Sequence, residues 1–322
     1  MATIKDVAKQ ANVSVATVSR VINNKGYVNE ETRQLVEKAI EKLHYVPNQL
    51  ARSLFNKQSK FISVFVPHFS TQFYNDLLAG IENMAVRLGY KIMLCNTQDN
   101  KEREADYIQA LGQYNIDGII LASNAHNAEA LINSNYPIIT VDHILSENIP
   151  SITSNNMLGG AIAAQKIISG GTQCVLELRG PSFLLTTSER SSGFRQTMIQ
   201  HNVPIITHDD DLINPNLSSL KDILLENPQI DSIFATTDFL AINAMNIVLD
   251  LGLKVPEDIQ IIGFDNIIYT NLVRPKITTI HQPVKQMGEM ALETLVHILE
   301  ENPPKEYHQV VEVKLIERES TR

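Results

Sequence analysis

The sequence predicts an α/β protein, in which a small helix-turn-helix head precedes a body of two lobes built on parallel sheets. The 322 residues are 43% hydrophobic and 20% charged, which fits about two globular domains. Short helical patterns fill the first 60 residues. From residue 61 onward, strand-like apolar runs alternate with helical patterns, as expected of parallel sheets covered by helices.

The distribution of charge supports this division. Residues 1–60 hold ten basic and five acidic side chains, a net charge of +5, whereas the rest of the chain carries −14. Lysine and arginine bind nucleic acids by neutralising phosphates. The charge therefore favours a nucleic-acid-binding head on an acidic body, and the alternative is a solvated basic helical domain.

The first helix is predicted between Ile4 and Ala11, where apolar residues recur at helical spacing. The Thr3 side chain can cap its start. Asn12 follows the helix and tolerates the left-handed conformation that a sharp turn needs.

A second helix is predicted from about Val15 to Asn23, with Ser14 as its cap and Val18 and Val21 facing inward. The two helices form a helix-turn-helix, whose second helix would lie in the major groove with Arg20 reaching guanine or phosphate. The alternative is a helical hairpin whose outer face binds nothing. The candidate DNA-binding residues are Thr3, Ser14, Val15, Ala16, Thr17, Ser19, Arg20 and Asn23.

A third helix is predicted from about Glu30 to Leu43, with Leu35 and Val36 facing the small core. A further short helix is predicted at about 47–56, because Pro47 can open it. Leu54 on this helix is a candidate apolar wedge for the minor groove, and the alternative is a plain linker. The head is thus assigned to residues 1–57 and the body to residues 58–322.

The body repeats a strand followed by a helix, and its roughly 260 residues predict two lobes rather than one sheet. The predicted strands are Phe61–Val66, Lys91–Cys95, Gly118–Ala122, Pro137–Val141, Gln173–Leu178, Ser232–Ala235 and Gln260–Phe264. The predicted helices are Phe73–Leu88, Glu102–Tyr114, Met157–Ile168, Glu189–His201, Phe239–Leu251 and Val284–Glu300.

Polar side chains follow several of these strands, where ligands of parallel sheets bind. Asp142, Asp265 and Gln282 offer carboxylate and amide groups that accept hydroxyl hydrogen bonds, as a sugar pocket requires. Arg190, predicted to open a helix after Gly180 and Pro181, adds a forked donor. The alternative for each aspartate alone is a helix cap.

The run from Ala2 to Asn24, together with Tyr45–Leu54, resembles the head and hinge of the LacI/GalR family of bacterial transcriptional repressors. The resemblance extends to Leu315–Arg322 and so covers essentially the whole chain. It implies a homodimer on a palindromic operator, with the second helix in the major groove and Leu54 in the minor groove. Asn12 stands where many members have glycine, and we expect no functional consequence.

The body resembles periplasmic sugar-binding proteins and the effector domains of the same family. This resemblance implies a small sugar effector that releases the operator, and a corepressor that acts through the same linkage in reverse is the alternative. The residues that match the family's sugar-contacting positions are Phe73, Asp142, Arg190, Asp265 and Gln282. The residues that stand where ribose binders usually have Asn, Phe, Arg and Asn are Thr71, Tyr74, His143 and Thr237. Ribose operon repressors of Gram-positive bacteria are the most similar group, and sucrose and related repressors remain open.

Enzymatic chemistry has no candidate residues. The sequence lacks a Walker motif, His-Glu-x-x-His and Gly-x-Ser-x-Gly, so neither catalysis nor a cofactor nor a metal is expected. Cys95 and Cys174 lie in apolar runs and are expected to be buried thiols. No signal peptide or membrane segment is found, which predicts a cytoplasmic protein. A sugar-binding protein without DNA function is the rival class, and a co-regulator protein remains open.

Overall fold

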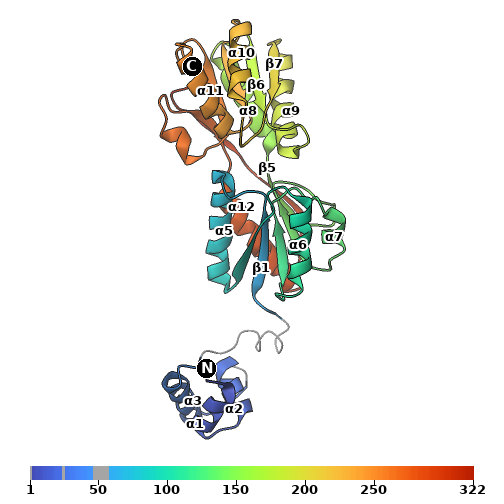
Figure 1. The fold of residues 1–322 in the computed structure, drawn as a ribbon, viewed down its shortest axis with the longest axis vertical. Helices are drawn as coiled ribbons and strands as arrows, with labels where there is room; N and C mark the ends of the chain where they lie inside the picture. Colours follow the sequence, from blue (N-terminus) through green and yellow to red (C-terminus); the bar gives the residue numbers. More distant parts are fainter. Residues whose placement is uncertain (1, 24–25, 46–57) are drawn as a thin grey trace. The chain divides into compact units, whose positions relative to one another are not determined.

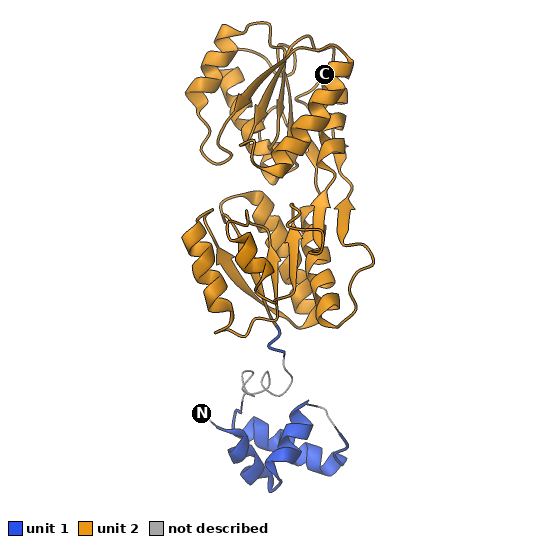
Figure 2. Ribbon diagram, turned by 90° about the vertical axis from the view of Figure 1, so that its right-hand side faces the viewer, with its two compact units in different colours: residues 1–60 blue, residues 61–322 orange. Residues whose placement is uncertain are grey.

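The computed structural model describes residues 2–23, 26–45 and 58–322. The chain divides into two compact units, residues 1–60 and residues 61–322 (Figure 2). The helix predicted at about 47–56, including Leu54, lies outside the described residues.

The head contains the three predicted helices: α1 (Ile4–Ala11), α2 (Val15–Asn23) and α3 (Glu30–Lys42). The predicted cap of α1 is present, because the backbone N–H of Asp6 donates to the Thr3 hydroxyl at 3.3 Å and the Thr3 N–H donates to the Asp6 carboxylate at 2.8 Å. Asn12 has a φ of 52°, so the left-handed turn between α1 and α2 is confirmed.

The head encloses a small apolar core in which Val7, Val18 and Val36 are fully buried. The prediction that Leu35 faces this core is wrong, since 54% of Leu35 is exposed. Successive helical residues are rotated by about 100°. The buried stripe of α3 follows Val36 and Ala39, which turns Leu35 towards solvent.

The first lobe of the body is a six-stranded sheet whose neighbouring strands are all parallel, in the order β11-β5-β4-β3-β1-β2 (Figure 1). Its strands are β1 (Phe61–Val66), β2 (Lys91–Asn96), β3 (Gly118–Leu121), β4 (Ile138–Val141), β5 (Ser151–Ser154) and β11 (His308–Val311). Its helices are α5 (Gln72–Leu88), α6 (Lys101–Leu111), α7 (Ala128–Ile132) and α12 (Val284–Leu299).

The second lobe is also six-stranded, in the order β12-β10-β9-β8-β6-β7, and only β12 runs antiparallel to its neighbour. Its strands are β6 (Val175–Arg179), β7 (Ile205–Asp209), β8 (Ser232–Ala235), β9 (Gln260–Asp265), β10 (Thr278–His281) and β12 (Lys314–Ile316). Its helices are α8 (Asn156–Ser169), α9 (Leu185–Gln200), α10 (Leu217–Glu226), α11 (Asp238–Asp250) and the short 3₁₀ helix η1 (Ile268–Asn271).

Both faces of each sheet are covered by helices, which explains why central strands such as β1 and β3 are apolar at most positions. In β1, Val64 belongs to the core under α5 and α12, whereas Phe65 belongs to the core on the opposite face. A strand buried on both sides needs apolar residues at every position rather than at every second one. The two-lobed parallel architecture predicted from the sequence is confirmed.

The chain crosses between the lobes three times, which the strand-helix pattern alone did not indicate. The crossings follow β5, β10 and β11, so α12 covers the first lobe although the strand before it belongs to the second. The prediction that a helix follows β4 is wrong, because the short strand β5 comes next. The helix predicted from Glu189 begins at Leu185, and Arg190 therefore lies in its second turn instead of opening it.

Cys95 and Cys174 are buried free thiols, as predicted. Burial raises the pKa of Cys95 to about 11, which makes it a poor nucleophile. Among the described residues, no helix combines the length and the apolarity needed to cross a membrane.

Candidate effector site and DNA-binding face

Arg190, on α9 of the second lobe, is buried and contacts three other parts of the lobe. Its Nη1 donates to the Thr236 carbonyl at 2.7 Å and to Asp265 Oδ1 at 3.2 Å. Its Nε donates to Asn156 Oδ1 at 2.9 Å, and the guanidinium carbon lies 3.9 Å from the centre of the Phe264 ring. No hydrogen bond from Nη2 is found in the part of the chain that the structure describes. This nitrogen is a donor available to a ligand.

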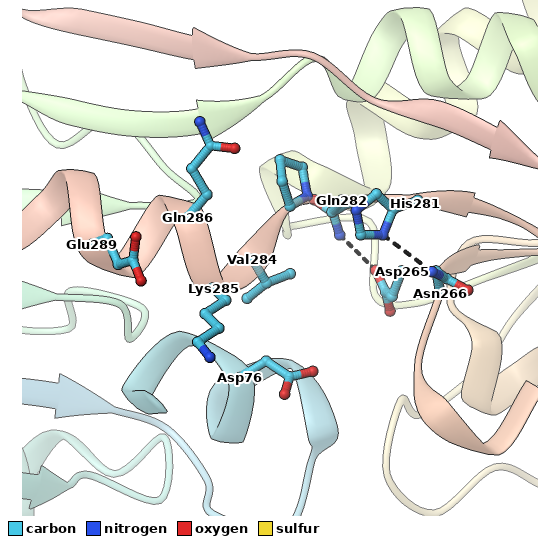
Figure 3. A pocket seen from close by; sticks show the side chains of 10 residues that line it. Asp76, Asp265, Asn266, His281, Gln282, Val284, Lys285, Gln286 and Glu289 are labelled. Atoms are coloured by element: carbon cyan, nitrogen blue, oxygen red, sulfur yellow. Dashed lines mark hydrogen bonds between the residues drawn. The ribbon is translucent and has the colours of Figure 1, made fainter. Parts of the chain in front are cut away.

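Asp265 is the last residue of β9 and shares its carboxylate between two donors. Besides Arg190, Gln282 Nε2 donates to Asp265 Oδ1 at 2.6 Å, and Figure 3 shows the two side chains pointing towards each other. Burial raises the pKa of Asp265 to about 6, and Arg190 and Gln282 act against this shift. Gln282 Oε1 is buried and has no hydrogen-bond partner among the described residues.

Asp142 follows β4 in the first lobe and faces the same guanidinium. Burial raises the pKa of Asp142 to about 7, while the nearby charge of Arg190 lowers it and those of Asp265 and Glu189 raise it further. Its Oδ1 is buried without a partner within the described ranges. The structure thus brings Asp142, Arg190 and Asp265 together from the two lobes.

The backbone at both carboxylates is unusual. Asp142 has a φ of 68° and Asp265 a φ of 114°, in the region that favours glycine. Such conformations cost about 1–3 kcal/mol each and cluster at functional sites, because the surrounding fold must hold them in place. Strain at two facing carboxylates supports a ligand site here.

His143 presents an acceptor rather than a donor. Its Nδ1 lies 3.1 Å from the Val141 carbonyl, which can only accept, so Nδ1 carries the proton. Burial lowers the pKa of His143 and favours the neutral ring. Nε2 is then unprotonated, and it is buried without a partner among the described residues. A ligand hydroxyl can donate to it.

Two aromatic rings lie side by side at the start of α5. The Phe73 and Tyr74 rings meet edge to face, with centroids 5.1 Å apart. Burial, together with Asp142 and other carboxylates, raises the pKa of Tyr74 far above its usual value and keeps its hydroxyl protonated. Thr71 Oγ1, just before α5, is buried without a partner among the described residues.

Thr237 has a structural contact of its own. Its hydroxyl accepts the Leu240 N–H at 3.3 Å and so caps α11. The capping role considered for the aspartates is thus found at this threonine. Within the described part of the chain, the side chains of Thr71, His143 and Thr237 form no hydrogen bond to the other candidate effector residues.

A cavity of about 490 Å³ lies where α5 and α12 of the first lobe approach the second lobe (Figure 3). Of the candidate effector residues, Asp265 and Gln282 line this cavity and the other seven do not. Its second-lobe wall includes Asn266 and His281, whose side-chain nitrogens are 3.2 Å apart. The volume is in the range of small-molecule sites.

The sequence analysis did not identify the groups that contact the Arg190 guanidinium within the second lobe, namely Asn156, Phe264 and the carbonyl of Thr236. A signal was available in the glycines of α8 and α9. A Cβ at Gly160 would lie 2.0 Å from the Arg190 carbonyl oxygen, and one at Gly193 would lie 1.9 Å from that of Met157. Only glycine permits this backbone contact, which holds the backbone of Arg190 against α8.

In the head, the outer face of α2 carries small side chains and one cation. Ser14, Val15, Ala16 and Arg20 are exposed, and Thr17, Ser19 and Asn23 are partly buried. Thr3 is also exposed at the start of α1. Some of these groups support the helix: the Thr17 N–H donates to Ser14 Oγ at 3.1 Å, and Asn23 Nδ2 donates to the Ser19 carbonyl at 2.9 Å.

Comparisons with known proteins agree with this organisation. Residues 3–48 match the family described as bacterial regulatory proteins, lacI family, and residues 174–321 match a periplasmic binding protein-like domain. The ribose operon repressor of Halalkalibacterium halodurans is 37% identical, covering 100% of this chain and 98% of the relative. The sucrose operon repressor of Streptococcus mutans is 34% identical and covers 99% of both chains.

Among solved structures, the lac repressor dimer bound to operator and the anti-inducer ONPF is 25% identical. The match has a TM-score of 0.90 and covers 99% of both chains. Similarity of this extent includes the head and both lobes. The chain therefore belongs to the LacI family of bacterial regulatory proteins.

Proposed function

We propose that the chain is a homodimeric repressor that binds a palindromic operator and is released from it by a small neutral sugar. The observation that carries the proposal is the meeting of Asp142, Arg190 and Asp265, contributed by two lobes that a ligand can draw together. The identity of 37% with a ribose operon repressor over the full chain makes D-ribose the first candidate.

The charges of the site favour a neutral polyhydroxy ligand over a sugar phosphate. The unpartnered atoms of Asp142, His143 and Gln282 are all acceptors, which match hydroxyl donors. The nearby cation, Arg190, is already paired with Asp265. A phosphate would add negative charge close to these two carboxylates, a cost that a neutral sugar avoids.

Operator release follows if the sugar binds one arrangement of the lobes more tightly than the other. A ligand shifts an equilibrium only by the ratio of its affinities for the two states. When the favoured state misplaces the two heads of the dimer, operator affinity falls by that ratio.

In the DNA-bound state, we propose that α2 lies in the major groove and that Arg20 contacts guanine or phosphate there. Thr3, Ser14, Thr17, Ser19 and Asn23 contact phosphates or base edges, and Val15 and Ala16 allow close approach. The segment around Leu54 would enter the minor groove.

The proposal is tested by titrating D-ribose, sucrose and D-ribose 5-phosphate into the protein bound to a palindromic operator. We expect D-ribose to weaken operator binding and its 5-phosphate to have little effect. Sucrose is the second candidate, because the S. mutans relative covers nearly the whole chain. Operator affinity that is unchanged by every sugar would contradict the sensor function.

A further inference from the structure

Asn156 lies where the chain passes from the first lobe to the second. The preceding residue, Asn155, donates its backbone N–H to the Val311 carbonyl of β11 in the first lobe at 3.0 Å. Asn156 is the first residue of α8, is only 2% exposed, and hydrogen-bonds to α9 in the second lobe. Two consecutive residues are therefore tied to different lobes.

The amide of Asn156 bridges two adjacent side chains of α9. Its Oδ1 accepts from Arg190 Nε at 2.9 Å, and its Nδ2 donates to Glu189 Oε2 at 3.1 Å. Carboxylate–guanidinium hydrogen bonds are about twice as strong as neutral ones. Without the amide, the Glu189 carboxylate would compete with Asp265 for Arg190.

This bridge is also rigid. The backbone contacts at Gly160 and Gly193 hold α8 and α9 together and so fix the backbone of Asn156 relative to that of Arg190. The position of the guanidinium is consequently tied to the crossing between the lobes.

We propose that Asn156 is a positioning residue for the effector response. Its amide orients the Arg190 guanidinium towards the ligand, keeps Glu189 from capturing it, and links it to the crossing after β5. The inference rests on the proposed function, since it concerns the same ligand site.

The test compares Asn156→Ala with Asn155→Ala, using D-ribose as the probe and sucrose as the second one. Asn155 is a matched control, because its side chain caps α8 by accepting the Leu158 N–H at 3.1 Å and does not contact Arg190. For Asn156→Ala we expect the sugar Kd to rise at least about tenfold, because a buried charged hydrogen bond is lost. Its sugar-free operator affinity, and both affinities of Asn155→Ala, should stay within about twofold of the wild type.

A second pair of variants remains informative if Asn156→Ala does not fold. Asn156→Asp keeps the acceptor for Arg190 Nε but sets a carboxylate against Glu189, so sugar binding should weaken. Adding Glu189→Gln supplies an amide donor to the new carboxylate, which restores the hydrogen bond between positions 156 and 189 with its direction reversed and leaves the one from Arg190 Nε as it was. The double variant should regain sugar affinity to within about threefold of the wild type.

Three outcomes decide the matter. Equal sugar Kd values for Asn156→Ala and Asn155→Ala would overturn the inference and leave the proposed function intact. A double variant as weak as Asn156→Asp would also overturn it, because a merely structural defect is not repaired by reversing a hydrogen bond. A wild-type protein whose operator binding responds to neither sugar would overturn the proposed function and this inference together.

Discussion

At the scale of single residues, the site concentrates negative charge around one arginine. Asp142 and Asp265 have pKa values raised to about 7 and about 6, chiefly by burial. A sugar hydroxyl that donates to a carboxylate binds the ionised form more tightly than the protonated one. Ligand binding must then release protons near neutral pH.

Sugar affinity should therefore fall as the pH is lowered from about 8 to about 5.5, at most roughly tenfold per pH unit for each carboxyl group that protonates. Calorimetry in buffers of different ionisation enthalpy measures both the affinity and the released protons. Asp142→Asn should flatten the upper part of this profile. An unchanged slope in that variant would show that Asp142 does not contact the sugar.

The Asp142 carboxyl group changes the free energy of unfolding with pH in the opposite direction to a carboxyl group whose pKa a salt bridge lowers. Because its pKa in the folded state is raised, the folded state binds protons more tightly, and stability falls as the pH rises from about 4 to about 7. Asp142→Asn should be more stable than the wild type at pH 8, on the order of a few kcal/mol, and the gain should disappear by about pH 4. Urea unfolding at both pH values checks this expectation, and a gain that is independent of pH would refute it.

At the scale of elements, helix ends that depend on nearby residues could be predicted from the sequence, whereas elements and contacts that depend on distant residues could not. The bounds of α1 and α2 follow from Thr3, Asn12 and Ser14, which act within one turn of the chain. The start of α9 was misplaced, because Leu184 and the threonines after it look extended in isolation.

The elements and contacts that were missed depend on distant partners. Strands β5, β11 and β12 are short and partly polar, and β11 and β12 pair only with strands that lie far away in the sequence. The strand-end positions of Asp142 and Asp265 could be predicted, since strand ends are visible in the pattern. The partnership of Asn156 with Arg190 could not, because the two residues are 34 positions apart.

The contact between α8 and α9 gives a prediction at this scale. Gly160→Ala should lower the free energy of unfolding of the body by about 1–3 kcal/mol, because the new methyl group would overlap the Arg190 carbonyl. Sugar binding should weaken as well, because the same overlap displaces Arg190. Gly112→Ala is the control, since a Cβ there meets only the Tyr136 hydroxyl at 3.8 Å. Thermal unfolding and sugar titration of both variants measure the effect. Similar behaviour of the two would mean that the helices can separate without loss.

For the head, Leu54→Ala should weaken operator binding while the sugar affinity of the free protein stays level. The reason is that an apolar wedge contributes only when it enters the minor groove. Gel-shift and calorimetric titrations measure the two affinities. An operator affinity equal to that of the wild type would indicate that the segment around Leu54 is a plain linker.

At the scale of the whole molecule, the proposed function requires reciprocity. If the sugar lowers operator affinity by some factor, the operator must lower sugar affinity by the same factor. Sugar titrations with and without saturating operator should therefore give a ratio of Kd values that matches the ratio from operator titrations. Unequal ratios would indicate a third component, such as a further binding site or a change in dimerisation.

The three crossings between the lobes also set an order of events during synthesis. The first lobe lacks α12 and β11 until residue 311 has been made, and the second lobe lacks β12 until residue 316. The head, whose described helices all precede residue 43, needs none of these segments. When four fifths of the chain has been translated, every described helix of the head has therefore been made, while both lobes of the body still lack segments that complete them.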